Sequence, residues 1–118
     1  MAVFVRPATW SYDIELFRSA AADEDELEAM LAAIATADQA LWVVESDERP
    51  VAFAWAKSEP DRVRLLRLHV KPGEEALPLL EPLVERIREE AGQNVRLETD
   101  AGAVDGVDDA VLTALGLR

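Results

Sequence analysis

Several residue types are missing or scarce in this chain of 118 residues. Cysteine is absent, which excludes disulfides and thiol chemistry and is common in cytosolic proteins. His69 is the only histidine and Tyr12 the only tyrosine, so few side chains besides carboxylates could act as acid or base. No apolar run approaches the ~18 residues of a membrane-spanning helix, and the first residues do not resemble a signal peptide. We therefore expect a cytoplasmic protein without a membrane partner.

Positive charge is also scarce, because 12 Lys and Arg stand against 24 Asp and Glu, a formal net charge of −12. Nucleic acids and anionic membranes need a basic surface, so neither is an expected partner. A basic small molecule or a basic protein suits this charge better, although an acidic surface that keeps the protein soluble is the simpler explanation. Lys57 and Lys71 are the only lysines, and this preference for arginine suggests a GC-rich bacterial genome.

Apolar residues recur with strand and helix periods along the whole chain, without a linker, repeat or low-complexity segment. The predicted strands cover residues 3–10 (stopped early by Pro7), 41–45, 51–57, 62–70 and 94–100. The predicted helices cover residues 11–20, 23–34, 80–91 and 108–117. This order predicts a single α+β (α/β layered) domain over residues 1–118, a mixed and mostly antiparallel sheet with helices on both faces.

The run Arg62–Val70 is the predicted central strand, and strict alternation divides its side chains between the two faces of the sheet. One face carries Arg67 and His69, which we expect to be the polar face. The opposite face joins the helix after it in a predicted core of Leu66, Leu68, Val70, Leu83, Val84 and Ile87.

Three short stretches resemble the GNAT family of N-acetyltransferases when they are taken in this order. They are "RPAT" (residues 6–9), "LHVKP" (68–72) and "LGLR" (115–118). In that family acetyl-CoA lies in the gap where a central strand splays from its neighbour, and strand amides polarise the thioester carbonyl. Its pyrophosphate sits on a loop V-x-P-x-x-(R/Q)-x-x-G-x-(G/A) at the N-terminus of the next helix. The resemblance thus implies a GNAT-like acyl-CoA N-acyltransferase fold with cofactor contacts at Leu68, Val70, Ala76 and Leu77.

The phosphate loop departs from the family pattern after Val70 and Pro72, which match it. Glu75 stands at the Arg/Gln position and would repel the pyrophosphate. Pro78 and Leu80 stand at the two small positions, where proline has no N–H to donate and a leucine side chain would block close approach. The prolines at 78 and 82 further predict that the regular helix begins near Pro82. We expect a degenerate acetyl-CoA site.

The acid and base of the family reaction are also hard to place. The family tyrosine, three residues before the Leu-Gly pair, corresponds to Leu112, and Tyr12 is far away in sequence. His69 and Glu98 are the candidate bases. A half-exposed strand histidine and an ordinary surface carboxylate remain the alternatives for these two residues. The acidic run 23–28 suggests a helix N-terminus and not a metal site.

The basic band Arg62, Arg64, Arg67 and Lys71 could receive an anion such as the cofactor's 3′-phosphate, or it could form salt bridges on the strand. The family continues past the "LGLR" position with two further strands, so we expect these terminal strands to be missing and the edge at residues 94–100 to be open. A homodimer could cover this edge, although its charged residues argue against pairing.

Two hypotheses about function follow. The first is a GNAT-like protein with a degenerate phosphate loop and no family tyrosine acid, serving as a non-catalytic binding or subunit-contact module. The second is an active acetyl-CoA-dependent N-acetyltransferase that acts on an amine substrate. Whether the protein is an enzyme therefore stays open from the sequence, and no metal is implied by either hypothesis.

Overall fold

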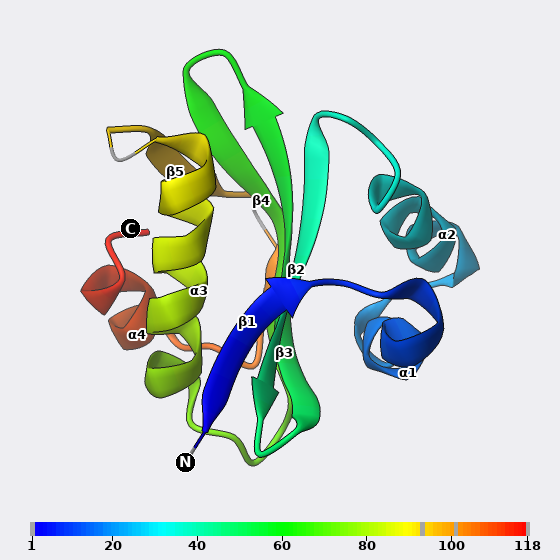
Figure 1. The fold of residues 1–118 in the computed structure, drawn as a ribbon. Coiled ribbons are helices and arrows are strands. Elements are labelled where there is room, and N and C mark those ends of the chain that lie inside the picture. The colour runs from blue at the N-terminus through cyan, green and yellow to red at the C-terminus, as the bar shows by residue number, and fades with distance from the viewer. Residues whose placement is uncertain (1, 93, 101, 118) are drawn as a thin grey trace.

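The computed structural model describes residues 2–92, 94–100 and 102–117 (Figure 1). The strands are β1 (Val3–Pro7), β2 (Gln39–Ser46), β3 (Arg49–Glu59), β4 (Arg62–Val70), β5 (Arg96–Thr99) and β6 (Val104–Asp105). The helices are α1 (Trp10–Ala20), α2 (Glu24–Ala33), α3 (Ala76–Ala91) and α4 (Asp109–Ala114). Among the described residues, none of these helices combines the length and apolar content needed to cross a bilayer.

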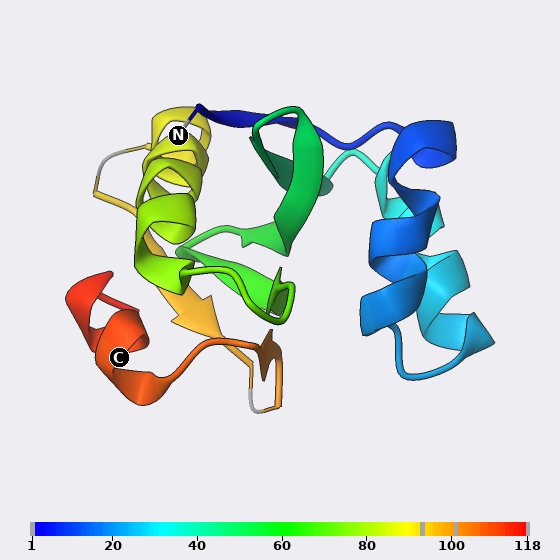
Figure 2. The same ribbon diagram turned by 90° about the horizontal axis from the view of Figure 1, so that it is seen from below.

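One mixed sheet runs through the middle of the molecule in the order β1-β2-β3-β4-β5. Strands β1 to β4 form an antiparallel meander, whereas β5 and β6 both pair with β4 in parallel. Helices α1 and α2 cover one face and α3 and α4 the other, which is seen from below in Figure 2. The predicted layers and the mostly antiparallel sheet are confirmed, and β6 is an addition that the sequence pattern did not predict.

Two hydrophobic cores stabilise these layers, one on each face of the sheet. The core under α3 and α4 contains Leu68, Val70, Leu83, Val84 and Ile87, as predicted. The second core packs α1 and α2 against the sheet around Phe17 and Phe53, whose rings meet edge to face 5.1 Å apart. The face of β4 that carries Arg67 and His69 is therefore covered by helices, and its prediction as a polar face was wrong.

Leu66 is only partly buried, and Leu65 takes its predicted place in the core. The reason is a β-bulge: Trp55 pairs with Arg67, but the next residue, Ala56, pairs with Leu65. The extra residue shifts the alternation of side chains by one position. Odd-numbered residues before the bulge and even-numbered residues after it therefore face the same core.

Helix α3 begins at Ala76, six residues earlier than the two prolines suggested, and Pro82 lies inside it. Its buried stripe, Leu79, Leu80, Leu83, Val84 and Ile87, starts before Pro82. Burial of this stripe outweighs the hydrogen bond that Pro82 cannot donate, and this explains why the prediction was wrong.

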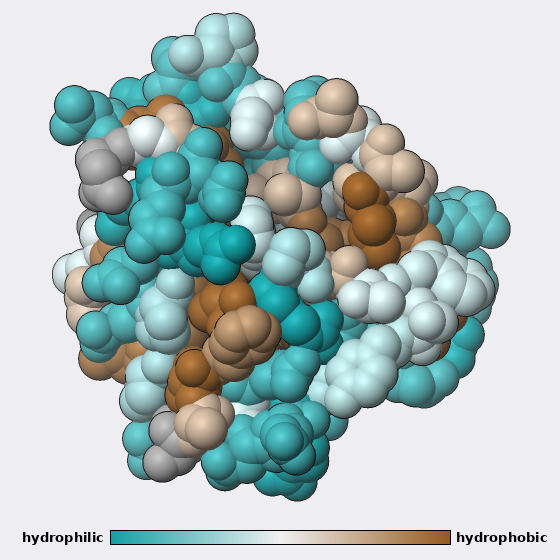
Figure 3. Space-filling view, viewed as in Figure 1, coloured by the Kyte–Doolittle hydropathy of each residue, from teal (hydrophilic) through white to brown (hydrophobic). Residues whose placement is uncertain are grey.

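The surface seen in Figure 3 is mostly hydrophilic, with one group of apolar residues along β1 and another beside α2. Phe4 in β1 is 62% exposed, and Trp10 and Tyr12 at the start of α1 are also exposed. The ring of Tyr12 lies 5.2 Å from the guanidinium carbon of Arg6 in β1, a strand that pairs only with β2 among the described strands. The edge at β1 is therefore the apolar one, in contrast to the charged edge at β5.

Candidate functional site

The site expected from the fold lies at the carboxyl half of β4, where its neighbour on the sheet changes. β5 pairs with β4 only from Arg62 to Leu65, and the amide of Asp100 donates to the Leu65 carbonyl at 3.2 Å. β5 then leaves β4. The gap expected between the two strands therefore opens at the bulge residue Leu66.

Residues 103–106 fill this gap, and we call them the strap. The amide of Leu68 donates to the carbonyl of Ala103 at 2.9 Å, and β6 pairs with β4 through Leu68–Val104 and His69–Asp105. Gly106 has a φ of +80°, and a Cβ atom there would lie 2.3 Å from the carbonyl oxygen of Val70. Only glycine permits so close an approach. The strap thus covers the edge of β4 at Leu68 and Val70, the two strand residues that we expected to contact the cofactor.

His69 lies on the other face of β4 and is 5% exposed. Its Nδ1 is 2.7 Å from Oδ2 of Asp105, and its ring packs 5.5 Å from that of Phe53. Because a carboxylate only accepts, Nδ1 carries the proton, and Nε2 is buried with no partner in the described part of the chain. The alternative hypothesis for His69, a half-exposed histidine on a strand, is therefore wrong. Asp105 was missed because no periodic pattern marks a two-residue strand.

A cavity of about 420 Å³ lies beside His69, between the end of α1 and the loop that follows β4. Its lining includes Ser19, Lys71, Glu74 and Asp105 in addition to His69. The charges around it are mixed, with two carboxylates and one ammonium group. This cavity and the strap meet at Asp105 and Gly106, which belong to both.

The N-terminus of α3 is the position of the family phosphate loop. Glu75 is the N-cap residue and makes no side-chain capping bond, while Pro78 is the third helical residue. Ala76 and Leu77, the predicted loop contacts, are partly buried against the core under α3. Leu80 is fully buried in that core, so its side chain does not block the loop as predicted but anchors the helix to the sheet.

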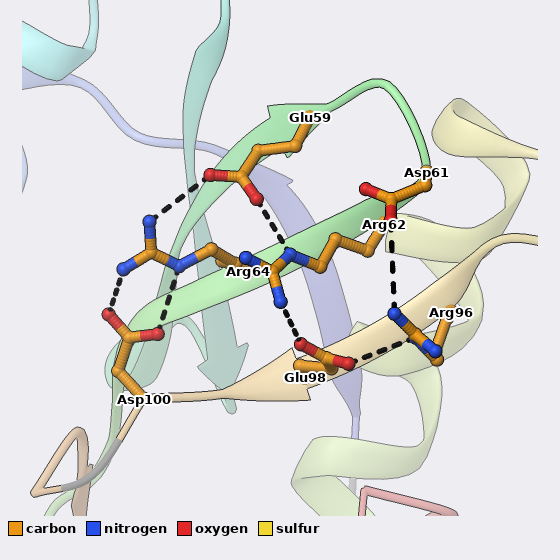
Figure 4. Close-up of polar contacts among 7 residues, drawn as sticks. All are labelled: Glu59, Asp61, Arg62, Arg64, Arg96, Glu98 and Asp100. Carbon is orange, nitrogen blue, oxygen red and sulfur yellow. Dashed lines mark hydrogen bonds and ion pairs between the residues drawn. The ribbon is translucent and has the colours of Figure 1, made fainter.

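Glu98, the second candidate base, lies opposite Arg64 near the start of β4 and is not brought together with His69. It accepts from Arg62 at 2.6 Å and from Arg96 at 2.9 Å (Figure 4). Arg62 also reaches Glu59, at 2.7 Å. The geometry makes Glu98 a member of a surface ionic network, as its structural alternative predicted.

Salt bridges account for the arginines of the basic band. Arg64 binds Asp100 with two nitrogens, at 3.0 and 2.6 Å, and Arg67 binds Glu26 at 2.5 Å. The hydrogen bonds to Asp100 and then to Glu59 raise the pKa of Arg64. Lys71 has no ion pair within the described residues and lies exposed at the cavity.

Other residues singled out in the sequence have structural roles. Leu112, at the family tyrosine position, is 1% exposed in the core under α4. Asp23 accepts from the amide of Glu26 at 2.9 Å and caps α2, so the acidic run there is a helix start, as predicted. Within residues 2–92, 94–100 and 102–117, no cluster of three metal-binding side chains was found.

No family model matches the sequence, and no curated protein matches it. The aminoglycoside antibiotic 6′-N-acetyltransferase AAC(6′)-Ih from Acinetobacter baumannii matches the structure with a TM-score of 0.75 at 20% identity, over 99% of this chain and 91% of its own. AAC(6′)-Iy, in complex with the bisubstrate analogue CoA-S-monomethyl-acetylneamine, gives 0.72 at 15% identity over 100% and 92%. PaiA N-acetyltransferase from Thermoplasma acidophilum, in complex with coenzyme A, gives 0.62 at 15% identity over 98% and 86%. The chain therefore has the GNAT fold, as its sequence resemblance implied.

Proposed function

We propose that this GNAT-fold protein is a binding or subunit-contact module that does not transfer acetyl groups. The observation that carries the proposal is the N-terminus of α3, where Glu75 is the N-cap and Pro78 the third residue. A pyrophosphate at this place would meet a like charge and would lack one of the N–H donors that a helix start offers.

Two further observations support the proposal. The edge of β4 at Leu68 and Val70, where the strand amides of the family meet the cofactor, faces the strap at hydrogen-bonding distance. Leu112 is buried in the core and cannot replace a tyrosine acid. The residues present thus do not fit acetyl-CoA in the position that the fold provides.

Titration with acetyl-CoA tests this proposal. We expect no heat of binding by calorimetry and no rise in melting temperature. A ligand present at a hundred times its dissociation constant would add about 2.7 kcal/mol to the free energy of unfolding, which a melting curve detects easily. Affinity in the micromolar range would contradict the proposal. The double variant Glu75→Arg/Pro78→Gly is the matched comparison, because it restores both the charge and the missing donor.

An active N-acetyltransferase remains the second candidate, and the His69–Asp105 pair favours it. A histidine whose tautomer is fixed by a carboxylate is a suitable general base. The assay is release of free coenzyme A in the presence of amines, starting with an aminoglycoside because that is the acceptor named for two of the structural neighbours. Turnover that disappears in His69→Gln would favour this candidate over the first.

The partner of a non-catalytic module is proposed from charge and from the open edge. A net charge of −12 favours a basic small molecule or a basic protein. A second copy of the chain, paired along residues 94–100, is the other proposal. The mass of the isolated protein distinguishes these proposals. A homodimer is heavier than one chain, whereas a protein that binds only a different, basic partner has the mass of one chain when it is isolated.

A further inference from the structure

We infer that β1 pairs antiparallel with β1 of a second copy of this chain, so that the two sheets become one. β1 is the first strand in the sheet order and lies along the border of the molecule in Figure 2. This inference goes beyond the proposed function, because it holds whether or not coenzyme A binds. It also differs from the pairing through residues 94–100, since it uses the opposite edge of the sheet.

The outer edge of β1 offers backbone groups at alternate residues. The amide of Ala8, one residue beyond β1, donates to the carbonyl of Leu41 at 2.9 Å. The register between β1 and β2 is constant from Val3 to Pro7, and hydrogen-bonded pairs alternate along an antiparallel ladder, so the even-numbered residues bond to β2. The N–H and C=O groups of Val3 and Val5 therefore point away from the sheet. Pro7, which has no N–H, stands at the third outward position, where proline is tolerated in an edge strand.

These outward groups match a second copy of the same strand. When two β1 strands pair antiparallel about Phe4, Val3 lies opposite the partner's Val5 and exchanges two hydrogen bonds with it, and the symmetry supplies two more. Phe4 then lies directly opposite Phe4 of the partner subunit, where Cα atoms are about 4.5 Å apart and side chains touch. Phe4 is 62% exposed in the single chain, so the pairing would remove an aromatic ring from water.

The charges of β1 do not oppose this pairing. Charged side chains are a common protection of strand edges, but Arg6 is the only charged residue of β1. Its guanidinium is already bonded to Asp13 and Glu45 within the chain. A basic extended segment is a less suitable occupant, because β1 itself contains no carboxylate and Glu45 beside it is neutralised by Arg6. The edge therefore fits a second copy better than a basic partner.

Hydrogen exchange tests the inference without any substitution. The amides of Val3 and Val5 face water in the single chain and would be bonded in the dimer, whereas those of Phe4 and Arg6 are bonded to β2 in both. We expect exchange at Val3 and Val5 to slow on the order of tenfold or more between micromolar and millimolar protein, with much smaller changes at Phe4 and Arg6. Exchange at Val3 and Val5 that does not depend on protein concentration would overturn the inference.

Charge substitutions at Phe4 test the register of the pairing. Phe4→Asp and Phe4→Lys should each be monomeric in sedimentation, because two like charges would lie directly opposite each other. An equimolar mixture of the two variants should regain the dimer, since each mixed pair brings opposite charges together. Ile34→Asp is the matched control, because Ile34 is also an exposed apolar residue but lies at the end of α2, and it should leave the dimer unchanged. A dimer that persists in Phe4→Asp, or a mixture that stays monomeric, would show that the strands do not pair about Phe4.

Salt dependence separates this contact from one made through ion pairs. Each chain has a formal net charge of −12, so added salt should strengthen a dimer whose contact contains no ion pair. A dimer that weakens with salt would indicate ion pairs across the contact, as expected for the charged edge at β5, and would overturn the inference. Coenzyme A titrated into the same sample tests the proposed function separately, because its binding would leave the pairing of β1 unchanged.

Discussion

Asp13 is the most completely buried charged side chain among the described residues, and it joins β1 to α1. It is 0% exposed and accepts from Arg6 Nη1 and Nη2, each at 2.8 Å, and from the amide of Thr9 at 2.7 Å. The hydrogen bonds of Arg6 to Asp13 and then to Glu45 raise the pKa of Arg6. Arg6 therefore connects β1 to β2 through Glu45 and to the first turn of α1 through Asp13.

Asp13→Asn should destabilise the protein by about 2–3 kcal/mol, because Arg6 would keep its buried charge and lose its main partner. Denaturant unfolding measures this loss. Glu15→Gln is the control, since among the described residues Glu15 forms an ion pair only with the exposed Arg18. This substitution should change stability by less than about 0.5 kcal/mol. Equal effects of the two substitutions would show that Asp13 is not a structural anchor.

Glu59 makes stability depend on pH in the acid range. Hydrogen bonds from Arg62 and then from Arg64 lower its pKa from the usual 4.5. A carboxylate with a lowered folded-state pKa stabilises fully above its unfolded pKa, and this contribution is lost as the pH falls through the folded value. We expect Glu59→Gln to flatten the fall in unfolding free energy as the pH drops below 4.5. An unchanged slope would contradict this assignment.

At the scale of single residues, the sequence reveals which side chains of the family site are missing, but it does not reveal which new contacts form in the folded chain. The missing donor at Pro78, the charge at Glu75 and the absence of a tyrosine at 112 are local facts that spacing alone reveals. The partner of His69 could not be predicted, because Asp105 lies 36 residues away and reaches it through a strand too short to have a period.

Among the helices, α3 carries a proline where an α-helix does not favour one. Pro78 is the third residue, whose N–H would have no partner in the helix, so proline costs little there. Pro82 lies in the interior, and its missing N–H leaves the Pro78 carbonyl without its i+4 donor.

Pro82→Ala should therefore raise the free energy of unfolding by about 2 kcal/mol, which is roughly 3 kcal/mol for the helix less up to about 1 for the freer unfolded chain. Thermal and denaturant unfolding of this variant and of Pro78→Ala give the comparison. If Pro78→Ala raised the free energy of unfolding as much as Pro82→Ala, the missing N–H would cost as much at the start of α3 as in its interior, and this explanation would be wrong.

Elements with local signals were predicted well, and those set by distant contacts were not. Asp23 accepts from the Glu26 amide as their spacing indicated, and it is the N-cap of α2. The Glu26 carboxylate accepts from the amide of Ala22, one residue before the N-cap that a capping box would use. The bulge at Leu66 has no such signal, because it depends on how β3 and β4 match in register. The start of α3 was likewise decided by the core beneath it and not by its two prolines.

Self-association is a property of the whole molecule, and its two sheet edges differ. β5 carries Arg96 and Glu98, which are paired with each other and with neighbours, whereas β1 carries the exposed Phe4.

For the proposed dimer through residues 94–100 we expect a species heavier than the 13.0 kDa chain in sedimentation at micromolar concentration. Glu98→Lys should weaken that dimer. A 13.0 kDa species would contradict the dimer, and a dimer lost in Phe4→Asp would move the contact to β1.

The order of the strands along the chain also bears on the protein while it is being synthesised. β1 to β4 can pair as soon as residue 70 is available, because their antiparallel partners are already made. The outer edge of β4 must wait until α3 and then β5 and β6 have followed. At roughly 5–20 residues per second, the nascent chain presents a bare strand edge for that interval. Arg62 and Arg64 then share the single carboxylate of Glu59 and lack Glu98 and Asp100. We therefore expect the net positive charge left at this edge to hinder aggregation of the growing chain until its C-terminal residues arrive.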